Sequence, residues 1–193
     1  MAAPIYVFDA DGVVIEPWGF AKLLEAKYKI TRPMTQSFFT GPFESCLKGL
    51  LSIEDILKPY LDEWKWQETP SEFMRLWLVA ENQPRHSVLS YVQNLRNQGY
   101  VCCLASNQER LRAEYIRKEM DFTSLFDYLY FSCDLEAVKP EARFFECIQN
   151  DLRCVPEDIY FWDDSASHIS GATQAGWNAT LFVDEKSLQV SSG

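Results

Sequence analysis

Two aspartates separated by one residue, Asp9 and Asp11, follow an apolar run and precede Gly12. The run of residues 5–8 is typical of a buried strand in a parallel sheet, and such sheets bind ligands beyond the carboxyl ends of their strands. Two neighbouring carboxylates repel each other unless a cation or a shared proton lies between them. A hard divalent cation is their natural partner, although an aspartate at this point can also simply cap a loop.

Three further motifs follow expected strands, namely Ser106-Asn107, Lys139-Pro140 and Asp163-Asp164-Ser165. Each alone has an ordinary structural explanation, because serine, asparagine and aspartate cap helices and most lysines are exposed to solvent. Together with the first motif they supply a carboxylate nucleophile, an acid or base, phosphate-binding groups, a lysine and an acidic pair that can hold a metal. The combination favours one chemistry over four independent structural roles.

These motifs require a sheet that brings strand ends together. Besides residues 5–8, strands are expected at residues 100–105, 128–131, 159–162 and 179–183. Helices are expected between them, at residues 84–97, 107–120, 140–152 and 166–176. Strands that alternate with helices predict an α/β fold, here a doubly wound, parallel, five-stranded Rossmann-like core.

Residues 17–80 show no strand-like alternation and instead contain helical spacing and two capping boxes. The first expected helix follows Pro17 and ends at residues 31–33, and a looser stretch covers residues 38–51. Pro59 is expected to kink a later helix. An all-helical insertion after the first strand predicts a cap. We expect a helical cap of residues 17–82 on a catalytic core of residues 1–16 and 83–193.

Composition narrows the possible partners. The net charge is −10 and no basic block is present, which argues against nucleic acid and against an anionic membrane surface. No apolar segment is long enough to span a bilayer, and residues 1–4 show no signal-peptide pattern. The six cysteines form no C-x-x-C pair, which favours reduced thiols and a cytoplasmic location. Residues beyond about Ser187 are expected to form a polar tail.

In the order of its four motifs the chain resembles the haloacid dehalogenase superfamily, over residues 5–183. The motifs similar to those of the superfamily are Phe8-Asp9-Ala10-Asp11-Gly12-Val13, Leu104-Ala105-Ser106-Asn107, Val138-Lys139-Pro140-Glu141 and Phe161-Trp162-Asp163-Asp164-Ser165. The helical insertion resembles the small C1 cap of one subgroup. Residues 39–52 and 139–143 are most similar to the α-D-glucose-1-phosphate phosphatase branch. His168 departs from the asparagine that many members carry, and we expect it to act only on neighbouring side chains.

The resemblance implies phosphoryl transfer through a covalent intermediate. Asp9 would attack phosphorus and form an aspartyl-phosphate, and Asp11 would protonate the leaving oxygen and later activate water. Asp11 must therefore start protonated, which repulsion from nearby carboxylates would favour. The implied Mg²⁺ ligands are Asp9, the backbone carbonyl of Asp11, Asp164 and, in support, Asp163. The implied phosphate-binding groups are the Ser106 hydroxyl, the backbone N–H of Asn107 at a helix N-terminus, and Lys139.

The expected function is therefore a Mg²⁺-dependent phosphatase that hydrolyses a small phosphorylated metabolite, such as a sugar phosphate. A phosphomutase of the β-phosphoglucomutase type keeps the same motifs and remains an alternative. A dehalogenase is disfavoured because Asp11 is present, and a non-catalytic binding protein because the carboxylates are intact. Substrate identity and oligomeric state stay open, and Lys48 is our first candidate for a cap residue that contacts substrate.

Overall fold

The computed structural model describes residues 3–188, so the tail expected beyond about Ser187 lies almost wholly outside the described residues. Its centre is a parallel five-stranded sheet in the order β3-β2-β1-β4-β5. The strands are β1 (Ile5–Phe8), β2 (Val101–Ser106), β3 (Tyr128–Phe131), β4 (Ile159–Asp163) and β5 (Asn178–Leu181). The expected doubly wound α/β fold is confirmed. All strands run parallel, so their carboxyl ends, and the motifs that follow them, share one edge of the sheet.

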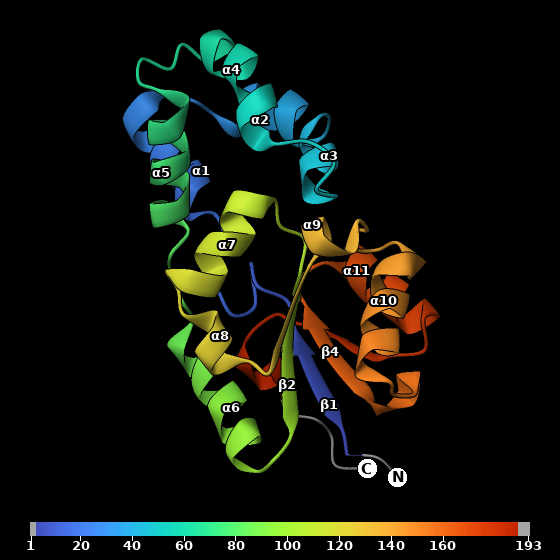
Figure 1. Cartoon of the computed structure of the whole chain (residues 1–193). Helices are drawn as coiled ribbons and strands as arrows, with labels where there is room; N and C mark the ends of the chain where they lie inside the picture. The colour runs from blue at the N-terminus through green and yellow to red at the C-terminus, as the bar shows by residue number, and fades with distance from the viewer. Residues whose placement is uncertain (1–2, 189–193) are drawn as a thin grey trace.

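Helices cover both faces of this sheet (Figure 1). One face carries α6 (His86–Asn97), α7 (Arg110–Lys118) and α8 (Phe122–Leu125), and the other carries α10 (Ala142–Leu152) and α11 (Ala166–Gln174). Tyr6 and Phe8 of β1 join the first core, whereas Ile5 and Val7 join the second. Since successive side chains of a strand point to opposite faces, burial on both sides explains the unbroken apolar run of β1.

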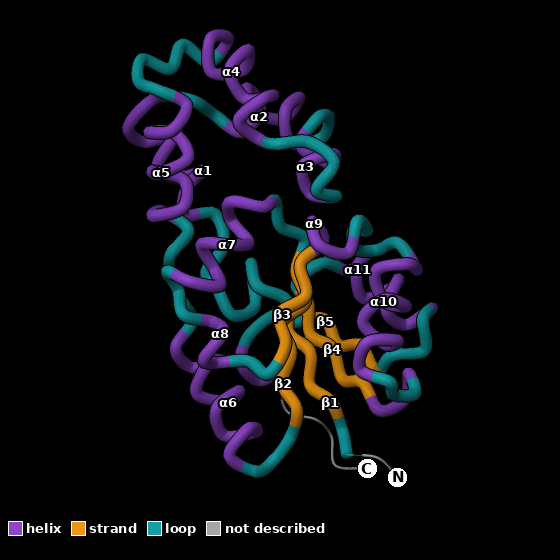
Figure 2. The backbone as a smooth tube through the Cα atoms, in the orientation of Figure 1, coloured by secondary structure: helices purple, strands orange, loops and turns teal. Residues whose placement is uncertain are grey.

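The helical insertion packs around a core of its own beyond the carboxyl edge of the sheet (Figure 2). It comprises α1 (Gly19–Leu23), a π-helical turn (Leu24–Tyr28), α2 (Arg32–Phe39), α3 (Phe43–Leu47), α4 (Ile53–Glu63) and α5 (Pro70–Ala80). Phe38, Leu57 and Phe73 are fully buried at its centre. We propose that residues 17–82 act as a cap over the remaining core.

Several element boundaries differ from those expected. The segment around Pro33 starts α2 rather than ending a helix, because proline suits the first turn, where no backbone N–H is needed. The stretch taken as loose contains part of α2 and the short α3, and α4 continues through Pro59. Two short helices, α8 and α9 (Ser132–Leu135), were not predicted. Every helix within residues 3–188 is too short or too polar to cross a membrane.

The chain enters and leaves the cap through two adjacent segments. Glu16 N donates to Gln83 O at 2.8 Å, and Arg85 N donates to Val14 O at 2.8 Å. The Arg85 side chain also donates to Val13 O at 3.0 Å. These bonds hold both crossings beside the turn that follows β1, so the cap is attached next to the first motif.

A substitution in the cap core tests whether the cap is a separate unit. Phe73→Ala removes a fully buried ring and should cost about 3–5 kcal/mol of local stability. Amide hydrogen exchange should then speed up in α1–α5 while the amides of β1, β2 and β4 stay protected. Phe144→Ala, in the core, is the matched control and should affect the sheet. Equal loss of protection in cap and sheet after Phe73→Ala would contradict an independent cap.

Candidate active site

The turn after β1 places Asp9 at the edge of the sheet. Asp9 N donates to Trp162 O at 2.9 Å, which extends the β1–β4 pairing by one residue, and Ala10 N donates to Asp9 Oδ1 at 2.7 Å. Gly12 has a φ of +87°, and a Cβ there would lie 2.1 Å from Asp164 Oδ2. Glycine is therefore required for the turn and for the close approach of Asp164. The first and fourth motifs meet at this point.

Lys139 is fully buried between two of the predicted carboxylates. Its Nζ lies 2.8 Å from Asp9 Oδ1 and 2.6 Å from Asp163 Oδ2, and it donates to Ala105 O at 3.0 Å. An ammonium group has three donors, and all three are used here. Lys139 thus joins the ends of β1, β2 and β4 through a single cation.

Asp163 is wholly buried and its two oxygens are occupied. Besides Lys139, Ser165 N donates to Oδ1 at 2.8 Å, and His168 Nδ1 lies 3.0 Å from both oxygens. Burial opposes ionisation of Asp163, but the lysine and the histidine outweigh it and hold its pKa well below the ordinary value. Asp163 therefore acts as an anchor for Lys139 and His168.

The remaining carboxylates carry more negative charge than Lys139 can balance. Burial raises the pKa of Asp9, with Asp163 and Asp11 adding to the rise and Lys139 opposing it. Burial, and then repulsion from Asp163, also raise the pKa of Asp164. Carboxylates of like charge placed this close together fit a cation that binds oxygen.

A second possible ligand group is less suited to a metal. Asp9, Asp163 and His168 each offer a ligand atom within 4.8 Å of the others. However, Lys139 Nζ already bonds both carboxylates, and its charge would repel a metal ion. Asp9 and Asp164 on the other side of the turn form the better pair of carboxylate ligands, and both line the cavity described below.

The second motif lies at the end of β2, with Ser106 as its last residue. Asn107 pairs reciprocally with Lys139, since Nδ2 donates to Lys139 O at 3.0 Å and Lys139 N donates to Oδ1 at 2.9 Å. The helix α7 begins only at Arg110 and is capped by Glu109, whose carboxylate accepts two backbone N–H groups. Asn107 therefore precedes the helix N-terminus at which it was expected.

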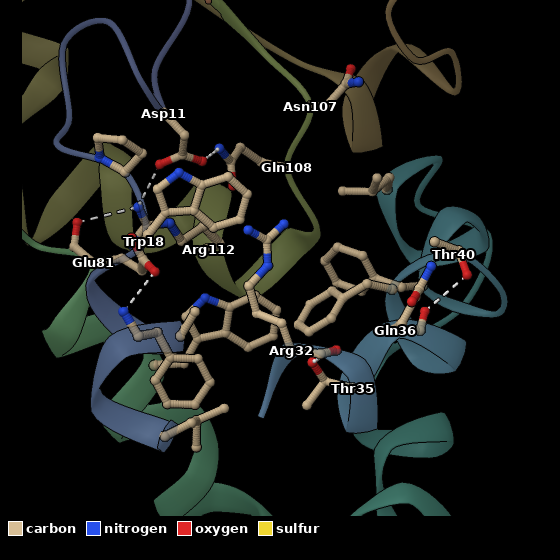
Figure 3. A pocket seen from close by; sticks show the side chains of 18 of the residues that line it. Asp11, Trp18, Arg32, Thr35, Gln36, Thr40, Glu81, Asn107, Gln108 and Arg112 are labelled. Atoms are coloured by element: carbon tan, nitrogen blue, oxygen red, sulfur yellow. Dashed lines mark hydrogen bonds and ion pairs between the residues drawn. The ribbon is translucent and has the colours of Figure 1, made fainter. Parts of the chain in front are cut away.

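Both oxygens of Asp11 are bound by side chains that sequence reasoning missed (Figure 3). Gln108 Nε2 donates to Oδ2 at 2.7 Å, and Arg112 Nη2 donates to Oδ1 at 3.0 Å. We expected other carboxylates to dominate the surroundings of Asp11. That prediction is wrong, because the buried guanidinium of Arg112 faces its carboxylate. Gln108 lies in the loop before α7 and Arg112 lies in its first turn, so no helical spacing in the sequence links the two side chains to Asp11.

A cavity of about 760 Å³ opens between the cap and the carboxyl edge of the sheet. The predicted residues that line it are Asp9, Asp11, Ser106, Asn107, Lys139 and Asp164. Asp163 lies behind Lys139, with no exposed surface. Lys48 is not among the lining residues, which corrects its suggested role in substrate contact. It bonds Glu141 at 2.7 Å and Glu44 at 3.4 Å, so it joins α3 to the core.

Comparisons with known proteins agree with this geometry. The sequence model described as haloacid dehalogenase-like hydrolase matches residues 6–182. The chain is 22% identical to bifunctional epoxide hydrolase 2 of Rattus norvegicus over 97% of its own length, but it spans only 38% of that protein. It is 25% identical to the phosphorylated carbohydrates phosphatase of Thermotoga maritima, covering 88% of this chain and 80% of the relative.

Solved structures share the fold. A HAD family enzyme from Bacteroides thetaiotaomicron, in complex with magnesium and inorganic phosphate, superposes with a TM-score of 0.73 at 18% identity, covering 99% of this chain and 98% of that one. The L-2-haloacid dehalogenase of Xanthobacter autotrophicus, with chloropropionic acid covalently bound, gives a TM-score of 0.71 at 16% identity, covering 97% and 81%. At such identities the likeness establishes the fold alone.

The Lys139 network predicts a measurable coupling. Lys139→Met leaves two buried carboxylates without their cation and should lower the free energy of unfolding by about 3–5 kcal/mol. Urea titration followed by circular dichroism would measure it. The double variant Lys139→Met/Asp163→Asn removes one of the stranded charges and should lose less than the single variant. If the stability lost by the double variant equals the sum of the losses in Lys139→Met and in Asp163→Asn alone, Lys139 and Asp163 are not coupled.

Proposed function

The chain belongs to the haloacid dehalogenase-like hydrolase family, and from that premise we propose that it is a Mg²⁺-dependent phosphatase of a small phosphorylated metabolite. One observation carries the proposal: Asp9, paired with the buried Lys139, and the second carboxylate Asp11 open on the same cavity. The phosphatase relative from Thermotoga maritima supports it. So does the fold shared with an enzyme crystallised with magnesium and phosphate.

In the proposed reaction Asp9 is the nucleophile. Its Oδ1 accepts from Ala10 N and lies 2.8 Å from Lys139 Nζ, whereas no residue in the described part of the chain donates to Oδ2. Oδ2 is therefore the oxygen free to attack phosphorus. A new P–O bond forms on Asp9 as the ester P–O bond breaks, and water then releases phosphate from the aspartyl-phosphate.

Asp11 is proposed as the acid and base. It gives a proton to the departing alkoxide in the first step and takes one from the attacking water in the second. Gln108 and Arg112 bind its oxygens in the structure. Asp11 must therefore take up a proton and exchange at least one of these donors for the ester oxygen before it acts as an acid.

The metal and Lys139 are proposed to offset the negative charge of the nucleophile and the phosphoryl group. Asp9, Asp164 and the backbone carbonyl of Asp11 would hold Mg²⁺, which offsets the repulsion between the nucleophile and the phosphoryl oxygens. Asp163 would support this site indirectly, through its bonds to Lys139 and His168. Ser106 and Asn107 would orient phosphate from the end of β2. A cytoplasmic location is part of the proposal, supported by six free cysteines.

Asp11 also separates the rival reactions. A halide leaves as a stable anion and needs no proton, so a dehalogenase has no use for a second carboxylate at this position. An alkoxide leaving group does need the proton. A phosphomutase would use the same residues and would differ by transferring the phosphoryl group to a second hydroxyl instead of water. Parallel assays of inorganic phosphate and of isomerised product distinguish these two outcomes.

Metal removal tests the cofactor. Oxygen ligands favour Mg²⁺, with Mn²⁺ as a substitute, over metals that prefer sulfur. Exhaustive treatment with EDTA should abolish phosphate release from p-nitrophenyl phosphate, and added Mg²⁺ should restore it. Circular dichroism before and after chelation controls for unfolding. Undiminished turnover by metal-free protein would rule out the proposed metal.

Two substitutions separate the roles of the aspartates. Asp9→Asn should abolish turnover of every ester, because the nucleophile is gone. Asp11→Asn should slow alkyl phosphates far more than p-nitrophenyl phosphate, since a nitrophenolate leaves without a proton. Burst kinetics would isolate the first step, and Asp62→Asn on the cap surface is the control. Equal losses for all leaving groups in the first step would argue against Asp11 as the acid.

A further inference from the structure

The cap contributes a mostly apolar wall to the cavity. Phe39, Phe43 and Trp77 line it and pack against one another, with ring centroids 5.2–5.7 Å apart. Phe20 stacks on Trp77 with an interplanar angle of 5°. Leu24 adds a further aliphatic side chain. A ligand that leaves the phosphate site toward the cap therefore meets aromatic and aliphatic surface.

Few polar groups of this wall are free to bind a ligand. Thr35 Oγ1 and Thr40 Oγ1 donate to backbone carbonyls of their own helix at 3.1 and 2.9 Å. Glu81 Oε1 accepts from Phe20 N at 2.9 Å. Within residues 3–188, the cap polar groups that line the cavity without a hydrogen-bond partner are the side chains of Thr31, Arg32 and Gln36, the indole N–H groups of Trp18 and Trp77, and the second carboxylate oxygen of Glu81. A sugar has a hydroxyl on nearly every carbon, and hydroxyls buried without partners are unfavourable.

Trp18 adds a further aromatic side chain to the cavity wall. It lines the cavity with 52% of its surface exposed, and its φ of 71° lies in the left-handed region that side chains other than glycine rarely adopt. Such strain tends to persist where a residue has a functional position to keep. The Arg32 guanidinium lies 4.1 Å from the ring centroid. Trp18 lines the same cavity as Asp11 and Arg112, which are labelled with it in Figure 3, and a leaving group would begin at Asp11.

We propose that this enzyme acts on phosphomonoesters of bulky apolar alcohols rather than on sugar phosphates. The phosphate lies at Asp9, and the apolar group extends past Trp18 along Phe39, Phe43 and Trp77. The inference rests on the proposed phosphatase function and narrows its substrate class. It also replaces the sugar phosphate suggested by the sequence resemblance, because most of the cap wall is aromatic and aliphatic surface that cannot pair with the hydroxyls of a sugar.

A matched pair of esters tests the substrate class. Cyclohexylmethyl phosphate and glucose 6-phosphate are both esters of primary alcohols on a six-membered ring, so their difference is chiefly one of polarity. We expect kcat/KM for phosphate release to be on the order of 10–100-fold higher for the cyclohexylmethyl ester. The kcat/KM for the larger 2-naphthylmethyl phosphate should be at least as high as that for the cyclohexylmethyl ester. A kcat/KM for glucose 6-phosphate equal to or above that of the apolar esters would overturn the inference and leave the phosphatase proposal standing.

A variant locates the effect at the cap wall. Trp18→Gly removes the ring and suits the positive φ, so folding should be preserved. It should lower kcat/KM for 2-naphthylmethyl phosphate about 10-fold more than for methyl phosphate. Tyr128→Ala, 46% exposed at the sheet edge and outside the cavity, is the control and should change neither value. Equal losses for both esters in Trp18→Gly would show that the indole does not contact the alcohol.

Binding without turnover keeps the two proposals distinguishable. Calorimetric titration of Asp9→Asn with 2-naphthylmethyl phosphate and with glucose 6-phosphate, in the presence of Mg²⁺, compares affinities when no ester is cleaved. Tighter binding of the naphthylmethyl ester supports the apolar site even if the wild-type protein hydrolyses neither ester, an outcome that would reject only the phosphatase function. Equal binding, or none, would reject the apolar site.

Discussion

The ammonium of Lys139, buried between Asp9 and Asp163, is the interaction on which the site depends. Burying charges is costly unless each is paired and hydrogen-bonded, and here a third donor reaches a backbone carbonyl of β2. Asn107 fixes the backbone of Lys139 from the other side. The arrangement holds the ends of three strands together and leaves Asp9 Oδ2 free within the described residues. The carboxylate of Asp164 lies beside the turn at Gly12.

The cap meets this rigid edge through weaker contacts. Lys48 bonds Glu141, and the Arg110 guanidinium donates to Gly49 O at 3.1 Å. The Lys48 ion pair is partly exposed, and such pairs contribute about 0–1 kcal/mol each. If residues 17–82 act as the proposed cap, contacts of this strength would suit a lid that closes over bound substrate.

Asp11 lies where these two parts meet. Arg112, which bonds its carboxylate, also donates to Glu81 O at 3.3 Å, at the end of the last cap helix, and Glu81 in turn caps the start of α1 through Phe20 N. Movement of the cap would therefore alter the hydrogen bonds that hold the proposed acid. One Arg112 nitrogen, Nη1, is buried and has no hydrogen-bond partner within residues 3–188, so this residue has capacity for another acceptor.

Local pattern determined much of this protein. The apolar runs predicted β1, β2 and β4 because these strands are buried on both faces of the sheet, whereas the edge strand β5 is mostly exposed. The parallel direction of the strands placed the motifs that follow them on one edge. Pairings between residues distant in sequence were decided only by the tertiary structure. Gln108 and Arg112 lie 97 and 101 positions from Asp11, and the bonds that occupy Asp163 depend on Lys139 and His168 packing against it. The apolar wall could not be predicted from the sequence either. Helical periodicity indicates which side chains face inward, but it does not distinguish a filled core from the lining of a cavity.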